Sequence, residues 1–367
     1  MRRPVRLPPS GLSLVLLLHA AAGLAGVGAA RTAALGGQTS AAPKLPPVCS
    51  PCIRGEMSYL ASDELRGRGS ATRDEGLAAL YAASLFEGFG LEPGGGPGGG
   101  PSGGPSGADG FVFDGFIQRV PLPNPLPASA VTELRGFEAA PRLQTSNVVG
   151  ILRGADPKLR SQIVLITAHL DHLGVGPAVH GDTIYNGADD DASGTTAVIE
   201  LARMLSRAKP PRRTVAFVLF GSEELGGLGS RYFFDHPPFA LSAIVANLEF
   251  EMIGRPDPLA RANLWLSGYR RSDLGAALVR HGAPLIADPH PEQHFFRRSD
   301  NYDLARRGVV AQTVSSFGLH RDYHQPSDDL SRIDFPHLNF AIAAMEPPIA
   351  WLANTDWTPK WRPGGRP

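Results

Sequence analysis

Three clusters of acidic and imidazole side chains follow one another between residues 167 and 230. The first contains His169 and Asp171, the second is the run Asp189-Asp190-Asp191, and the third is the pair Glu223-Glu224. Three adjacent carboxylates repel one another, and a helix N-terminus offsets only about 1 kcal/mol of that repulsion. Imidazole and carboxylate groups together are the ligands that a divalent metal such as zinc prefers. The clusters therefore favour a two-zinc hydrolase over the alternative, a set of solvated acids at loop ends.

Each residue type in these clusters has a role that such a centre requires. Asp171 lies two residues after His169 and can accept a hydrogen bond from the far nitrogen of that imidazole, which would fix its tautomer. In the pair Glu223-Glu224, one carboxylate can bind metal while its neighbour acts as general base on a water molecule. His324 offers a second imidazole in a loop before the last predicted helix. His172 and His180 are expected to be loop histidines without such a role.

The segments around the clusters predict an α/β domain. Residues 163–167 and 215–220 are short, apolar and rich in β-branched residues, which is typical of strands at the centre of a sheet. Helix-type patterns alternate with them, so we expect a central mixed, mostly parallel sheet with helices on both faces. Ligands of such sheets bind beyond the carboxyl ends of the strands. Further strands are expected at 147–152, 243–250, 263–266 and 309–314, and helices at 192–207, 228–234, 274–281 and 335–352.

The N-terminal residues resemble an export signal. Three arginines in the first six residues precede an apolar run that ends in small residues, so residues 1–30 are expected to be a signal peptide of a secreted or periplasmic protein. An uncleaved membrane anchor is the alternative, and no other run is apolar enough for a stable span after cleavage. Residues 31–52 are expected to be a flexible lead-in. Within it, Cys49 and Cys52 favour a small local disulfide over two free thiols.

The remaining chain divides by composition. Residues 53–144 are expected to be an N-terminal segment that packs on the catalytic domain, with helical patterns at 53–91 and extended segments at 111–122 and 131–143. Residues 93–110 are rich in glycine and proline and are expected to be a disordered loop. The catalytic domain is expected at 145–355, followed by a tail at 356–367. The formal net charge is zero, which argues against a nucleic-acid partner. The sequence leaves the oligomeric state open.

Four ordered elements of the sequence resemble the M28 family of zinc peptidases, the di-zinc aminopeptidases and their relatives. His169-Leu170-Asp171 resembles the family's H-x-D element, and residues 187–194 resemble its G-A-D-D-x-A-S-G element. Glu223-Glu224 resembles the E-E pair, and Asp322-Tyr323-His324 resembles the terminal D-Y-H element. The resemblance covers residues 145–355, and four elements in the family's order are far more specific than one short motif.

The resemblance implies a role for each of these residues. His169 would bind one zinc ion, His324 and Glu224 the other, and Asp190 would bridge the two. Glu223 would be the general base or acid. The last ligand is usually an aspartate, and Glu251 aligns with it through the neighbours Met-Ile-Gly. That glutamate is one methylene longer than the family's aspartate, and Glu249 is the competing candidate.

The resemblance implies a metallo-exopeptidase that acts on peptide substrates with two Zn²⁺ ions per chain. Together with the predicted signal peptide, it indicates a secreted enzyme. An aminopeptidase is favoured, and carboxypeptidase or dipeptidase activity stays open because both occur on this scaffold. Two alternatives keep the fold but change the function. One is a glutaminyl cyclase-like acyltransferase, and the other is a non-catalytic binding module. The side-chain preference of the enzyme cannot be read from these motifs.

Overall fold

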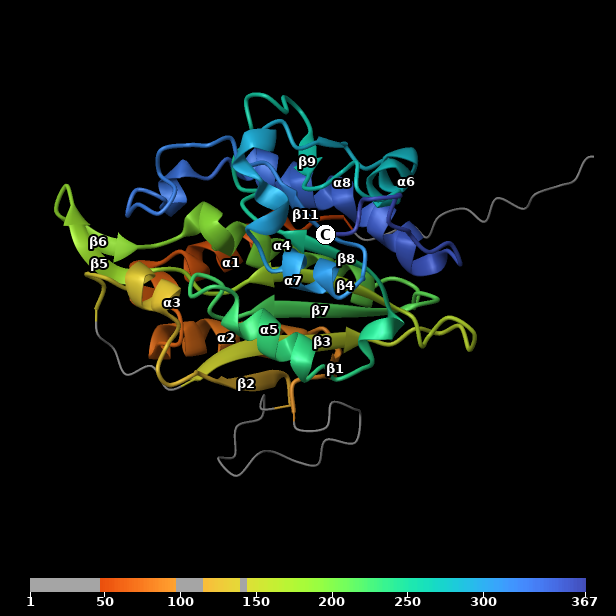
Figure 1. The fold of residues 1–367 in the computed structure, drawn as a ribbon, viewed down its shortest axis with the longest axis horizontal. Coiled ribbons are helices and arrows are strands. Elements are labelled where there is room, and N and C mark those ends of the chain that lie inside the picture. The colour runs from red at the N-terminus through yellow and green to blue at the C-terminus, as the bar shows by residue number, and fades with distance from the viewer. Residues whose placement is uncertain (1–46, 97–114, 139–143) are drawn as a thin grey trace, which may run out of the picture. The chain divides into compact units, whose positions relative to one another are not determined.

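The computed structural model describes residues 47–96, 115–138 and 144–367. The predicted signal peptide, most of the lead-in and residues 97–110 of the predicted loop lie outside this part of the chain. A nine-stranded sheet runs through the described residues (Figure 1). Its strands are, in spatial order, β1 (Glu92–Pro93), β3 (Gln144–Leu152), β7 (Thr214–Phe220), β4 (Ile163–His169), β8 (Ile244–Phe250), β11 (Ala311–Ser315), β9 (Leu264–Leu266) and β10 (Leu285–Ala287), with β2 (Ile117–Pro121) also paired to β3.

The four central strands, β7, β4, β8 and β11, run parallel to one another. Antiparallel pairs flank them, with β3 beside β7 and β9 beside β11. The predicted mixed α/β sheet is confirmed, with parallel pairing concentrated at its centre. Because parallel strands end at the same edge of a sheet, the loops that follow these four strands meet there.

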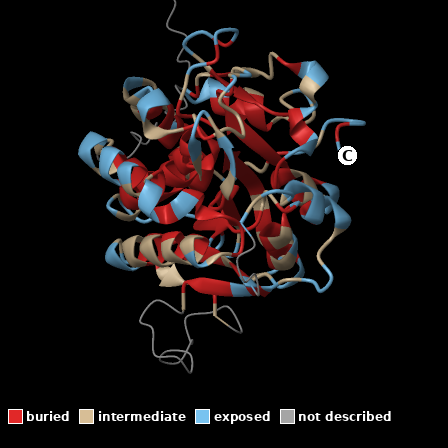
Figure 2. Cartoon of the chain, turned by 90° about the vertical axis from the view of Figure 1, so that its left-hand side faces the viewer, coloured by how far each residue is buried: buried red, intermediate tan, exposed pale blue. Residues whose placement is uncertain are grey.

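Successive side chains of each strand point to opposite faces of the sheet, so a hydrophobic core forms on each side of it. Val164 and Ile166 belong to the first core, whereas Ile163 and Leu165 belong to the second. The helices that contribute to the first core are α1 (Ser50–Leu60), α2 (Arg73–Gly88), α4 (Gly194–Ser206), α6 (Leu274–Arg280) and α8 (Phe335–Asn354). Helices α5 (Leu228–Asp235) and α7 (Asn301–Arg306) cover the second, in front of the sheet in Figure 1. Figure 2 shows the strands buried between helices whose outer surfaces are exposed.

Shorter elements connect these layers. No described helix is both long enough and apolar enough to cross a membrane. The remaining elements are helix α3 (Ala128–Glu133), the hairpin of β5 (Gly174–Val179) and β6 (Asp182–Tyr185), a π-type turn at Ala188–Ser193, and 3₁₀ turns at Asp63–Arg68, Leu241–Ala243, Pro291–Gln293, Phe295–Arg297 and Leu330–Arg332.

Three expectations need correction. The segment predicted as extended at 131–143 begins inside α3, because helix-favouring alanines at 128 and 130 outweigh the β-branched residues that follow. The lead-in predicted as flexible already forms the first turn of α1, where Pro51 suits the helix start. The loop predicted to be disordered from residue 93 starts in β1, where Pro93 pairs with Gly150. In the segment predicted as a tail, Trp361 forms a bridge with Ser272.

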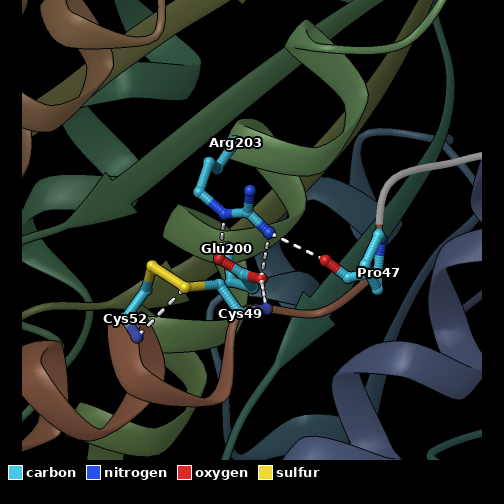
Figure 3. The surroundings of a disulfide bond; sticks show 5 residues. All are labelled: Pro47, Cys49, Cys52, Glu200 and Arg203. Atoms are coloured by element: carbon cyan, nitrogen blue, oxygen red, sulfur yellow. Dashed lines mark hydrogen bonds and ion pairs between the residues drawn. A yellow bond between two sulfur atoms is a disulfide. The ribbon is translucent and has the colours of Figure 1, made fainter.

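A local disulfide closes the N-terminus of α1, and hydrogen bonds join this end of the helix to α4 (Figure 3). Cys49 and Cys52 form the disulfide that the sequence favoured. The backbone N–H of Cys49 donates to Glu200 in α4, and Arg203 donates to the same carboxylate and to the carbonyl of Pro47. The carboxylate of Glu200 therefore links the start of α1 to the buried guanidinium of Arg203.

Glu56 carries a buried carboxyl group in this same interface and makes folding depend on pH. Burial, followed by the charge of Glu200, raises its pKa from 4.5 to about 8, although Arg203 opposes the shift. The folded protein thus keeps a proton that the unfolded chain releases, so this contribution to stability is present below pH 4.5 and is lost as the pH rises through about 8.

We expect Glu56→Gln to be more stable than the wild type at pH 8, by on the order of 1 kcal/mol, because glutamine needs no proton to stay neutral. The difference should vanish near pH 4.5. Urea unfolding at the two pH values measures it, with the exposed Glu87→Gln in α2 as control. A difference that is equal at both pH values would contradict this interpretation.

Candidate metal centre and active site

The predicted site residues meet at the carboxyl edge of the central strands. His169 is the last residue of β4, Glu223 and Glu224 follow β7, and Glu251 follows β8. His324 lies in the loop after β11. The end of each central strand, or the segment that follows it, thus carries an imidazole or a carboxylate, as expected for ligands that bind beyond the carboxyl ends of the strands.

The carboxylate of Asp190 faces both imidazoles. Its Oδ1 lies 3.1 Å from Nε2 of His169, and its Oδ2 lies 3.3 Å from Nε2 of His324. The same His324 nitrogen lies 3.3 Å from Oε2 of Glu224. This nitrogen is buried, yet it has no hydrogen bond to either carboxylate. An imidazole nitrogen that faces two carboxylates in this way is suited to a shared cation.

A tight turn places Asp190 in this position. Gly187, which precedes the turn Ala188–Ser193, has φ 60°, and a Cβ there would lie 2.2 Å from the carbonyl oxygen of Asp190. The peptide bond between Asp190 and Asp191 is cis. The carboxylate of Asp328 accepts the backbone N–H groups of Asp189 and Asp190, each at 3.0 Å. The turn is therefore fixed through its own backbone.

The two flanking aspartates hold the turn against its neighbours. Asp191 accepts the backbone N–H groups of Gly194 and Met252, both at 3.0 Å. Asp189 accepts the N–H of Gly254 at 2.7 Å, and its other oxygen lies 2.9 Å from Nε2 of His320. These contacts hold both outer aspartates in the turn, although Oδ2 of Asp191 is buried and has no hydrogen-bond partner among the described residues. The middle carboxylate faces the site.

The carboxylate of Asp171 was expected to fix the tautomer of His169, but it has another role. Nδ1 of His169 lies 3.2 Å from the backbone carbonyl of Asp171 but 3.9 Å from its carboxylate. The carboxylate instead accepts the backbone N–H groups of Glu223, at 2.9 Å, and Glu224, and the hydroxyl of Ser70. The carboxylate of Asp171 therefore positions the glutamate pair, and its backbone orients the imidazole.

Glu251, rather than Glu249, lies in the pocket. It lines the same pocket as Asp190 and Glu223. Glu249 lies inside β8, and its Oε2 accepts the backbone N–H of Asn301 at 2.9 Å and the hydroxyl of Thr313 at 3.1 Å. Glu249 thus anchors the start of α7, and Glu251 is the better placed of the two candidate ligands.

The protein environment separates the pKa values of the neighbouring glutamates. Burial, and then the charges of nearby carboxylates, raise the pKa of Glu223 well above its ordinary value, against the opposing charge of His169. Burial also acts on Glu224, but the charge of the nearby His324 and the hydrogen bond with His172 outweigh it and lower its pKa to about 2. The low pKa of Glu224 suits an ionised metal ligand, and the raised pKa of Glu223 suits a group that accepts and releases a proton.

His172 is the site residue that the sequence analysis missed. It was expected in a loop without a role, but it is fully buried, and its Nδ1 lies 2.8 Å from Oε1 of Glu224. Potential ligand atoms of His172, Asp190 and Glu224 all lie within 4.8 Å of one another. The available signal was its place directly after Asp171 at a strand end.

The N-terminal segment also contributes to the site. Arg68 is completely buried and donates to the carbonyls of Leu170 at 2.9 Å, Asn186 at 2.7 Å and Gly187 at 3.0 Å. It therefore joins the loop after His169 to the loop before Asp190. Nothing in its sequence context, a glycine-rich turn, indicated a buried arginine.

A pocket opens beside the acidic cluster. Asp190, Glu223 and Glu251 line one part of it, and the side chains of Trp265, Phe295 and Phe317 line another. Its remaining lining residues are Met252, Arg298, Thr313, Ser315 and Tyr323. A polar centre next to an aromatic pocket is the usual form of a small-molecule or peptide site.

The α/β sheet and its strand-end cluster of imidazoles and carboxylates define a class of protein, the metallohydrolases of the α/β type. Residues 147–345 match the model of Peptidase family M28. This chain belongs to that family.

Individual relatives agree with this assignment. The chain is 36% identical over 113 residues to the aminopeptidase YwaD of Bacillus subtilis, a match that covers 30% of this chain and 22% of that protein. The fold is similar to that of a zinc aminopeptidase from Bacillus subtilis, with a TM-score of 0.60 and 16% identity over 84% of this chain and 96% of that one. It is also similar to a glutaminyl cyclase of Porphyromonas gingivalis, with a TM-score of 0.58 and 16% identity over 83% and 99%. The chain spans about a fifth of the length of the curated relatives it matches first.

Proposed function

We propose that this protein is a zinc-dependent aminopeptidase that hydrolyses N-terminal peptide bonds. The observation that carries the proposal is the position of Asp190, whose carboxylate faces His169 and His324 while Glu223 lines the same pocket. Family membership supports peptidase chemistry, and the relatives whose names say aminopeptidase support the exopeptidase assignment.

The donor set fits zinc, which prefers imidazole nitrogen and carboxylate oxygen. His169, Asp190 and Glu251 would hold one ion, and His324, Asp190 and Glu224 the other. The buried Nε2 of His324, which faces two carboxylates without hydrogen bonding to either, supports this arrangement. When bound, zinc would supply Lewis acidity to a water molecule and to the scissile carbonyl group.

Glu223 would move the proton in this reaction. Its carboxylate lines the pocket beside Asp190, and its backbone N–H is fixed by Asp171 at 2.9 Å. An elevated pKa lets a carboxylate take a proton from the attacking water and release it to the departing amine. The aromatic part of the pocket would exclude water from the bound substrate.

His172 would tune the zinc site that contains Glu224. By binding Oε1 at 2.8 Å, it leaves Oε2 directed at His324. We expect His172→Asn to weaken zinc binding by about 10-fold, as for other partners of metal ligands. Competition titration with a chromogenic chelator measures this affinity, with the exposed His180→Asn as the control. Equal affinities in the two variants would show that His172 has no such role.

The proposal is tested with one peptide in two forms. Zinc-loaded protein should release the first residue of Leu-Gly-Gly and leave N-acetyl-Leu-Gly-Gly intact, because an aminopeptidase needs a free amine. Release of the C-terminal residue from the acetylated peptide would instead indicate a carboxypeptidase. In a separate reaction with a peptide that begins with glutamine, cyclisation of that residue without hydrolysis would indicate the acyltransferase that shares this fold.

We also propose that the protein is exported. The basic and apolar pattern of residues 1–30 supports it, and so does the disulfide between Cys49 and Cys52, since such bonds persist in oxidising compartments. N-terminal sequencing of the protein recovered from outside the cytoplasm should find a start near residue 31. An intact Met1 would contradict cleavage.

A further inference from the structure

Arg298 is the cationic side chain among the residues that line the substrate pocket. This side chain is exposed. Its contacts are the ring of Phe295, 4.9 Å from the guanidinium carbon, and the hydroxyl of Tyr323 at 3.5 Å. Among the described residues, no carboxylate forms an ion pair with it. Arg255, by contrast, is neutralised by Asp322 at 2.7 Å.

The pocket is therefore polarised. Asp190, Glu223 and Glu251 give it an acidic part, and Arg298 gives it a basic one. A ring that supports a guanidinium through a cation–π contact restricts its motion, and the planar fork then matches a carboxylate. Arg298 is the cationic side chain of the pocket lining, so an anionic group of a substrate would be attracted to it.

We propose that Arg298 binds a carboxylate of the substrate, so that the preferred substrates are acidic or very short peptides. This inference rests on the proposed aminopeptidase function and specifies its substrate class. The carboxylate has two possible sources, the side chain of an N-terminal glutamate or the C-terminus of a dipeptide. Both present the same chemistry to the guanidinium.

Two pairs of nearly isosteric substrates separate these sources. Glutamyl- and glutaminyl-p-nitroanilide differ only in the side-chain carboxylate, and Leu-Leu and Leu-Leu-amide differ only in the terminal one. We expect the wild type to favour the carboxylate member of at least one pair by about 5-fold in kcat/KM, as for an exposed ion pair of good geometry. The pair that shows the preference identifies the source.

Arg298→Gln should abolish that preference, and Arg297→Gln should retain it. Arg297 is the matched control because it is adjacent and exposed but does not line the pocket. Circular dichroism and zinc content of both variants should match the wild type, which shows that they fold. Equal rates within both pairs for the wild type, or a preference that persists in Arg298→Gln, would overturn the inference. Failure of the wild type to hydrolyse any of the substrates would instead refute the aminopeptidase function itself.

Discussion

Glu223→Gln is expected to lower kcat by about 10²–10⁴-fold while zinc binding is retained, since general acid–base catalysis contributes this much in enzymes. Glutamine has nearly the same shape, and the backbone N–H of residue 223 would still donate to Asp171. The variant lacks only the carboxylate that can accept a proton. Steady-state kinetics on leucyl-p-nitroanilide, together with zinc analysis of the same sample, measure both effects.

Glu224→Gln is the matched comparison for this experiment. Its carboxylate lies 3.3 Å from the His324 nitrogen and has its pKa lowered to about 2, as a metal ligand requires. We expect this variant to lose zinc as well as activity. If Glu223→Gln kept a tenth or more of the wild-type kcat, the general-base role of Glu223 would be wrong.

Asp190→Asn is expected to abolish both zinc binding and hydrolysis. One oxygen of this carboxylate lies 3.1 Å from His169 and the other 3.3 Å from His324, so both proposed ions depend on it. An amide is neutral and offers one oxygen in place of two, which removes the bridge. Zinc per chain after dialysis is expected to fall to near zero, and turnover is expected to be undetectable.

Asp182→Asn is the control for this substitution, because Asp182 lies in the exposed β5–β6 hairpin. It should retain wild-type zinc content and activity. Circular dichroism should show that Asp190→Asn still folds, since the backbone contacts of Asp328 hold the turn without the Asp190 side chain. An Asp190→Asn protein with full zinc content would contradict the bridging assignment.

The parts of the site that the sequence predicted are those that a short run of neighbouring residues determines. An apolar β-branched run that ends at His169 indicates both a strand and its edge, and the central strands were predicted to within a few residues. The run of three aspartates predicted a neutralising cation, and the structure adds backbone N–H donors to the outer two, Asp191 and Asp189.

The parts that the sequence did not predict depend on contacts between distant residues. His172 binds Glu224, which lies 52 residues later, and Arg68 reaches a carbonyl 118 residues away. Neither partner is visible in a local pattern, so His172 was interpreted as a loop residue. The helix α3 was missed because short alanine-containing segments with β-branched neighbours fit both a helix and a strand.

The central claim is that hydrolysis at the Asp190 cluster requires zinc. It is tested most directly when metal-free protein is titrated with zinc while binding and hydrolysis of leucyl-p-nitroanilide are followed together. We predict no turnover in chelator, a rise with added zinc, and saturation when two ions per chain have bound. Full turnover in chelator, or saturated zinc binding without turnover, would contradict the account.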